Sequence, residues 1–136
     1  MKDWLLRPLH DLDKLNQRHD AVQELFDNTL SRREIKDILK GFQDVERLLS
    51  RLGHGSISPR DLDSLKTSLN TLKDLKQFLS EEPLKSKLMK LLVKSIDTHK
   101  QVSEKLEEAL VEEPPLVLRD GGIFKKGYSE ELDDLR

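Results

Sequence analysis

The sequence contains no cysteine, and only 4% of its 136 residues are aromatic. Without cysteine the chain has no disulfide framework and no thiolate zinc site, which fits a reducing cytosol. No apolar run approaches the ~20 residues that a membrane-spanning helix requires, and the first residues lack the pattern of a signal peptide. We therefore expect a cytoplasmic protein that makes no contact with membranes.

An excess of one charge is also lacking, because 24 basic and 26 acidic residues leave a net charge of -2. This balance argues against a strongly basic nucleic-acid-binding domain and leaves room only for a local basic patch. Charged residues make up 37% of the chain and hydrophobic residues 35%. For a chain of about one domain's length, this composition favours an extended helical array over a compact sphere.

Proline and glycine are few, and all of them fall where the apolar pattern is interrupted. Both residues are costly inside helices, so they separate one helix from the next. A capping-box pattern at Ser31 and Glu34 and an N-cap at Ser58 followed by Pro59 predict two of the helix starts. The sequence therefore predicts an all-α fold, a bundle or array of about five helices. These helices are expected over residues 11–28, 31–40, 43–52, 58–79 and 83–111.

Leucine recurs at spacings of three and four along residues 62–79, which predicts an amphipathic helix whose apolar face packs on another helix. The same spacing continues over residues 84–110. At 1.5 Å per residue, one helix over residues 83–111 would be a rigid strut roughly 40 Å long.

After two consecutive prolines the pattern changes. Residues 116–118 and 123–124 favour extended structure, and residues 120–122 (Asp-Gly-Gly) are a turn signal. We therefore expect a short hairpin-like excursion near residues 116–124. Ser129 then suits the N-cap of a further helix of only two turns, which needs a packed apolar face to be stable. For this reason the chain is expected to be a segment of a longer protein.

Residues 122–129 have the glycine spacing and the final hydroxyl of a phosphate-binding loop, but Tyr128 stands where such a loop needs lysine. A turn is therefore the favoured interpretation. The four histidines are scattered over different expected elements, and none has a second ligand at metal-binding spacing. We predict no catalytic, cofactor-binding or metal-binding residue in this chain and do not expect it to be an enzyme.

Three lysines at helical spacing, Lys87, Lys90 and Lys94, are candidates for contact with nucleic acid or an acidic partner. Base-specific or damage-specific binding would also need arginine or aromatic contacts, which this stretch lacks. An ordinary solvated helix face is the favoured interpretation of the three lysines.

One group of residues near the carboxyl end resembles a sequence block of the MutS family of DNA mismatch repair proteins, Arg-Asp-Gly-Gly-x-Ile-x-x-Gly-Tyr-x-x-Glu-Leu-Asp. Four further blocks resemble the family in the same order, at residues 4–9, 15–22, 44–52 and 58–66. Phe124 departs from the pattern, which has a smaller aliphatic residue there, and this alters packing rather than the assignment. The residues that match the block near the carboxyl end include Arg119, Asp120, Gly121, Gly122, Gly127, Tyr128, Glu131 and Leu132.

The resemblance implies that residues 1–136 are part of a MutS-like core, or lever, domain, which joins a DNA clamp to an ATPase domain and relays the nucleotide state between them. The mismatch-reading, clamp and ATPase domains are expected to lie outside this chain. The parent protein is expected to bind mismatched double-stranded DNA, ATP and Mg²⁺ and to act as a dimer. The partners of this segment would be the other domains of the same parent chain.

Two alternatives from other classes stay open. One is a free-standing helical adaptor that binds a partner helix along a groove. The other is a weak nucleic-acid binder that uses the basic residues near Lys87.

Overall fold

The computed structural model describes residues 2–135 and the side chains of residues 4–135, and this part of the chain is all-α as predicted. It contains eight α-helices rather than about five, because short helices form near both ends and one expected helix is divided. No strand forms within residues 2–135. The helices are α1 (Lys2–Leu6), α2 (Leu12–Asp27), α3 (Thr29–Leu39), α4 (Val45–Gly53), α5 (Pro59–Glu81), α6 (Lys87–Ser95), α7 (Lys100–Ala109) and α8 (Glu130–Asp134).

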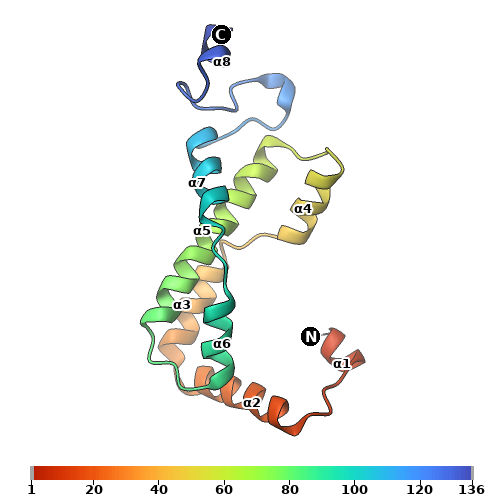
Figure 1. Cartoon of the computed structure of the whole chain (residues 1–136), viewed down its shortest axis with the longest axis vertical. Coiled ribbons are helices and arrows are strands. Elements are labelled where there is room, and N and C mark those ends of the chain that lie inside the picture. The colour runs from red at the N-terminus through yellow and green to blue at the C-terminus, as the bar shows by residue number, and fades with distance from the viewer. Residues whose placement is uncertain (1, 136) are drawn as a thin grey trace.

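The molecule is elongated, and α5 runs through its middle (Figure 1). Helices α2, α3 and α6 surround the carboxyl half of α5, while α4 and α7 lie beside its amino half. The carboxyl-terminal segment extends past α7 to one end of the molecule, and α1 lies to the side of α2. Trp4 of α1 stacks under Arg18 of α2, whose guanidinium carbon is 3.7 Å from the ring centroid.

Helix starts follow local capping chemistry. The predicted N-cap at Ser58 is confirmed, and it forms part of a capping box that was not predicted: the Ser58 hydroxyl accepts the Asp61 N–H and the Asp61 carboxylate accepts the Ser58 N–H. The predicted capping box at Ser31 is wrong, because α3 begins two residues earlier at Thr29. Asn28 is the N-cap, its side-chain oxygen accepts the Ser31 N–H at 3.1 Å, and the buried Ser31 hydroxyl instead contacts Glu82.

The leucine stripe of α5 is the packing face that its spacing predicts, but it serves two separate cores. Leu65 and Leu69 join the buried Leu48 of α4, with Leu106 of α7 packed against them. Further along, Leu79 packs with Ala21 of α2 and Met89 of α6. We call the first group the α4–α7 module and the second the α2–α3–α6 module.

The single strut expected over residues 83–111 is wrong, because the chain breaks between α6 and α7. Asp97 Oδ1 accepts the backbone N–H of His99 at 2.9 Å, a local bond that competes with helix formation. His99 then takes a left-handed conformation with φ of 44°. Helix α6 packs mainly on α2, and α7 packs mainly on α5. The two halves of the expected helix therefore belong to different modules. The longest helix is α5, with 23 residues.

The excursion near residues 116–124 forms, but not as the predicted hairpin. Residues 118–120 make a single 3₁₀ turn, and the segment at Phe124 pairs instead with the end of α7. The Val111 N–H donates to the Ile123 carbonyl at 3.0 Å, and the Lys125 N–H donates to the Ala109 carbonyl at 2.8 Å. This pairing buries Ile123 beside the end of α7 and folds the carboxyl-terminal segment back onto the α4–α7 module.

Across residues 2–135, no helix combines the length and the apolar character that crossing a bilayer would require.

Candidate functional site

The candidate nucleic-acid residues Lys87, Lys90 and Lys94 all lie on α6, and all three side chains are exposed. Helix α6 buries Met89 against α2 and α5, which leaves the lysines facing solvent. None of the three forms an ion pair or side-chain hydrogen bond with any residue that the structure describes. They are therefore available for a partner, although the structure adds no aromatic or arginine side chain to their face.

The start of α6 is held by a carboxylate from a distant helix. Glu24 of α2 accepts the backbone N–H groups of Lys85 and Ser86, the latter at 2.9 Å. Burial raises the pKa of Glu24, but hydrogen bonds from Ser86 and Lys85 and the charge of Lys85 outweigh it and place the pKa below its ordinary value. A negative charge here also suits the positive end of α6, whose first turn contains no acid of its own.

An open groove of about 650 Å³ lies beside this contact, between α2 and the segment that leads into α6. One wall carries carboxylates and the other carries lysines, so the groove has charges of both signs. This arrangement offers no concentrated positive charge for a phosphate group. Its charged lining residues are Asp20, Glu24, Asp27, Lys85 and Lys87.

The block near the carboxyl end that resembles the MutS family forms a series of turns. Arg119 and Asp120 belong to the 3₁₀ turn, and Gly121 and Gly122 follow with φ of 67° and 65°, a conformation that L side chains rarely adopt. The chain reverses here so that the Phe124 segment can reach the end of α7. These residues therefore have a structural role in the fold.

The second half of the block leads into α8. Gly127 also has a positive φ, and its N–H donates to the Asp133 carboxylate. The Tyr128 ring stacks on the Phe124 ring, with 5.7 Å between the ring centroids. Glu131 of α8 is exposed and Leu132 is half-buried. The departure from the family pattern at Phe124 thus supplies the partner for Tyr128.

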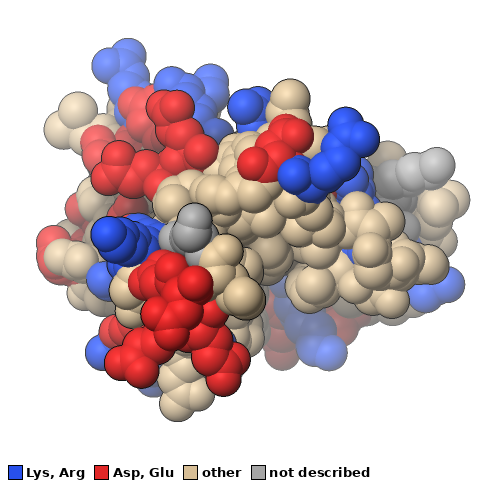
Figure 2. Space-filling model, turned by 90° about the horizontal axis from the view of Figure 1, so that it is seen from above, with Lys and Arg blue, Asp and Glu red and all other residues tan. Residues whose placement is uncertain are grey.

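Residues 122–129 do not fit a nucleotide phosphate. Tyr128 replaces the lysine that such a loop requires, and the following helix α8 has only five residues and begins with two acids. Figure 2 shows acidic side chains gathered at the end of the molecule that carries the C-terminus. Within residues 2–135 no group of three His, Asp or Glu side chains could hold a metal ion. We assign no ATP or Mg²⁺ contact to this segment.

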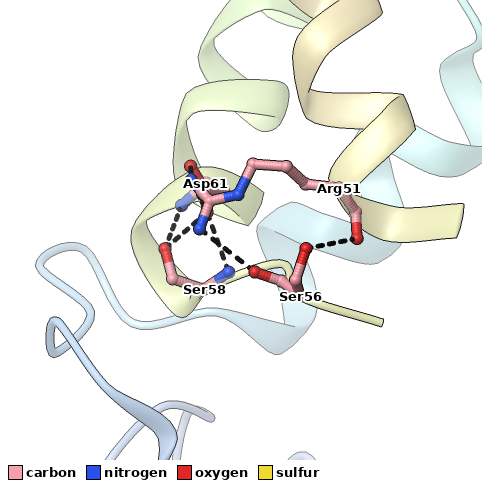
Figure 3. A network of polar contacts seen from close by, with 4 residues as sticks. All are labelled: Arg51, Ser56, Ser58 and Asp61. Atoms are coloured by element: carbon pink, nitrogen blue, oxygen red, sulfur yellow. Dashed lines mark hydrogen bonds and ion pairs between the residues drawn. The ribbon is translucent and has the colours of Figure 1, made fainter. Parts of the chain in front are cut away.

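A polar network of four residues, Arg51, Ser56, Ser58 and Asp61, joins α4 to α5 (Figure 3). Arg51 Nη1 contacts both Asp61 carboxylate oxygens, at 2.8 and 2.9 Å, and Nη2 donates to the Ser56 carbonyl at 3.1 Å. The Ser58 hydroxyl donates to Asp61 at 2.7 Å. The hydrogen bonds from Ser58 and, to a smaller degree, the Arg51 charge hold the Asp61 pKa below its ordinary value although burial raises it.

This network is a joint between two helices rather than a reaction centre. Arg51 and Asp61 are paired with each other, and the lowered pKa of Asp61 makes its carboxylate a weak base for the Ser58 hydroxyl. Ser58 and Asp61 could be recognised from the sequence as a helix start. Arg51 could not, since it lies ten positions away and only the turn at residues 54–57 brings it back to the carboxylate.

Comparison with known proteins places this helical chain in a family. The family model for MutS domain III matches residues 1–135, and the chain belongs to this family. It is 42% identical over its whole length to the DNA mismatch repair protein MutS of Halothermothrix orenii and 40% identical to that of Methanosarcina acetivorans. The MutS of Alkaliphilus oremlandii is 39% identical over 99% of the chain.

The chain covers only 15% of the length of each of these three relatives. The resemblance inferred from five short blocks is therefore confirmed at the level of the family and of one domain of a much longer type of protein.

Proposed function

We propose that this chain is a structural core segment of a MutS-like mismatch repair protein, which holds the DNA clamp and the ATPase domain in a defined relation and relays the ATPase state to the clamp. The parent would bind mismatched double-stranded DNA, ATP and Mg²⁺ through other domains and act as a dimer. The observation that carries the proposal is the family match along residues 1–135, in a chain without a catalytic or metal constellation among its described residues.

Exposed apolar side chains support the proposal, because contacts with other domains of the parent would cover them. Trp4, Leu5 and Leu6 are exposed on α1, and Leu118 and Leu135 are exposed in the carboxyl-terminal segment. These two groups lie at separate parts of the elongated molecule (Figure 1). A segment that joins two other domains needs contact surfaces that are separated in this way.

The experiment is a domain replacement. The matching 15% of the Halothermothrix orenii MutS is exchanged for this chain, and binding to mismatched and matched DNA duplexes is measured with and without ATP. We expect the chimera to prefer the mismatch and to respond to ATP, whereas a chimera with a Gly/Ser linker of equal length should lose the response. The proposal is wrong if the linker chimera responds to ATP as well as the replacement does.

A second candidate function is direct contact with the DNA backbone through Lys87, Lys90 and Lys94, favoured by their exposure and lack of partners on α6. Neutralising a phosphate contact weakens binding and reduces its salt dependence. Within the chimera, the triple Lys→Glu variant should bind all duplexes more weakly and with a smaller salt slope.

The matched control is a triple Lys→Glu variant with the same charge change, at the exposed Lys36, Lys73 and Lys126. Equal loss of binding in both variants would mean that only net charge matters, and the assignment to α6 would be abandoned.

A further inference from the structure

The middle of α5 differs from its two ends in what packs against it. The apolar core of the α4–α7 module reaches Leu72, and that of the α2–α3–α6 module begins at Leu75. We call residues 68–76 of α5 the waist. Its apolar residues are Leu69, Leu72 and Leu75, and it also buries two hydroxyl residues, Ser68 and Thr71. The two apolar cores therefore meet at the waist, with polar groups buried beside them.

Both connections between the modules cross α5 at the waist. In the connection from α3 to α4, Gly41 approaches Thr71, and the Gln43 N–H donates to the Ser68 hydroxyl at 3.0 Å. In the connection from α6 to α7, the Ile96 carbonyl accepts from the Lys76 ammonium at 2.7 Å. Both connections thus cross α5 at the same level of the molecule, and hydrogen bonds from Gln43 and to Ile96 hold them there.

Side-chain hydroxyls also bond to the helical backbone of α5 near the waist. The hydroxyls of Thr67, Ser68 and Thr71 donate to the carbonyls four residues earlier, at 3.0, 2.9 and 2.9 Å. Such bonds compete with the helical N–H for the same carbonyl and often bend helices. Three such bonds occur within five residues of α5, from Thr67 to Thr71.

We infer that α5 bends at the waist and that the two modules turn against each other as rigid bodies. Among the described residues, every substantial helix contact that links the two modules involves α5. Each module can therefore keep its own apolar core while α5 bends. The motion changes the polar contacts of the two crossing connections, which can re-form at a new angle. This inference depends only on the packing of this chain and stands whether or not the proposed function is correct.

The absence of native cysteine makes a distance measurement direct, because pairs of introduced cysteines can be spin-labelled without background. In the full 136-residue chain, one pair spans the waist, Lys36→Cys on α3 with Glu46→Cys on α4. Two control pairs stay within one module, Lys36→Cys with Lys90→Cys and Glu46→Cys with Glu108→Cys. All four positions are exposed. Pulsed dipolar spectroscopy gives the distance distribution of each pair, and circular dichroism verifies that each variant is folded.

We expect the distribution across the waist to be at least about twice as wide as either control, as for hinged domains. A distribution as narrow as the controls would overturn the hinge. Thr67→Ala removes one back-bonding hydroxyl beside the waist, improves helix propensity and should narrow the distribution. Ser95→Ala is its match, since Ser95 of α6 is exposed and its hydroxyl donates to the Leu92 carbonyl at 2.8 Å, outside the waist. If both alanine variants change the distribution equally, or neither does, the location of the hinge is wrong.

Discussion

Replacing Asp61 by asparagine removes the charge at the joint between α4 and α5 without leaving a cavity. The carboxylate accepts bonds from the Ser58 N–H, the Ser58 hydroxyl and Arg51, at 2.7 to 2.9 Å. Hydrogen bonds to a charged group contribute ~1.5–3 kcal/mol and neutral ones ~1 kcal/mol. Asparagine keeps one neutral acceptor, and the Arg51 side chain is 38% exposed and partly screened. We expect a loss on the order of 2 kcal/mol.

A loss of that size is measurable in a chain whose total stability is of order 5–15 kcal/mol. It should lower the melting temperature by roughly 5–10 °C for a chain of this length. Urea and thermal unfolding followed by circular dichroism at 222 nm give both values. Asp37→Asn is the control, because Asp37 pairs only with the neighbouring Lys40 on the surface and should change the midpoint little.

The pH dependence provides an independent measurement. Because the folded pKa of Asp61 lies below its ordinary value, its stabilising contribution is complete above the ordinary value and is lost as the pH falls through the folded pKa. The difference between the wild type and Asp61→Asn should therefore be largest near neutral pH and shrink in acid. A variant that matches the Asp37→Asn control at neutral pH, or a difference that grows in acid, would refute the assigned role of the network.

Three further changes test other parts of the fold. Glu24→Gln removes the carboxylate that holds the start of α6. Burial raises the Glu24 pKa, but its hydrogen bonds lower it by more, so the wild type should lose stability as the pH falls. The stability of the variant, measured by urea unfolding over a series of pH values, should depend less on pH. At Gly41 an alanine Cβ would lie 2.7 Å from the Thr71 hydroxyl oxygen, so Gly41→Ala should cost about 1–3 kcal/mol in urea unfolding, and adding Thr71→Ala should recover part of the loss. His99→Val places a β-branched residue at φ of 44° and should cost about 1–2 kcal/mol, whereas His99→Gly should unfold at or above the wild-type midpoint.

The features that the sequence predicted correctly are those set by neighbouring residues. The N-cap at Ser58, the leucine face of α5 and the glycine turn at residues 121–122 each depend on residues within a few positions. Exposure of the three lysines on α6 followed in the same way from their spacing. The five sequence blocks were sufficient to predict the family, because they preserve residue identity and order along the chain.

The features that were predicted wrongly depend on residues that are distant in the sequence. Leucine spacing continues through residues 83–111, but the helix divides near His99, where the bond to Asp97 forms and the chain passes from one core to the other. The Phe124 segment was expected to pair with residues 116–118. It pairs instead with residues 109–111 at the end of α7, where Ile123 becomes buried. Residues close in the sequence therefore determined most helix starts and the apolar face of each helix. The tertiary structure decided where the expected long helix divides and which segments pack together, because several segments compete for the same buried positions.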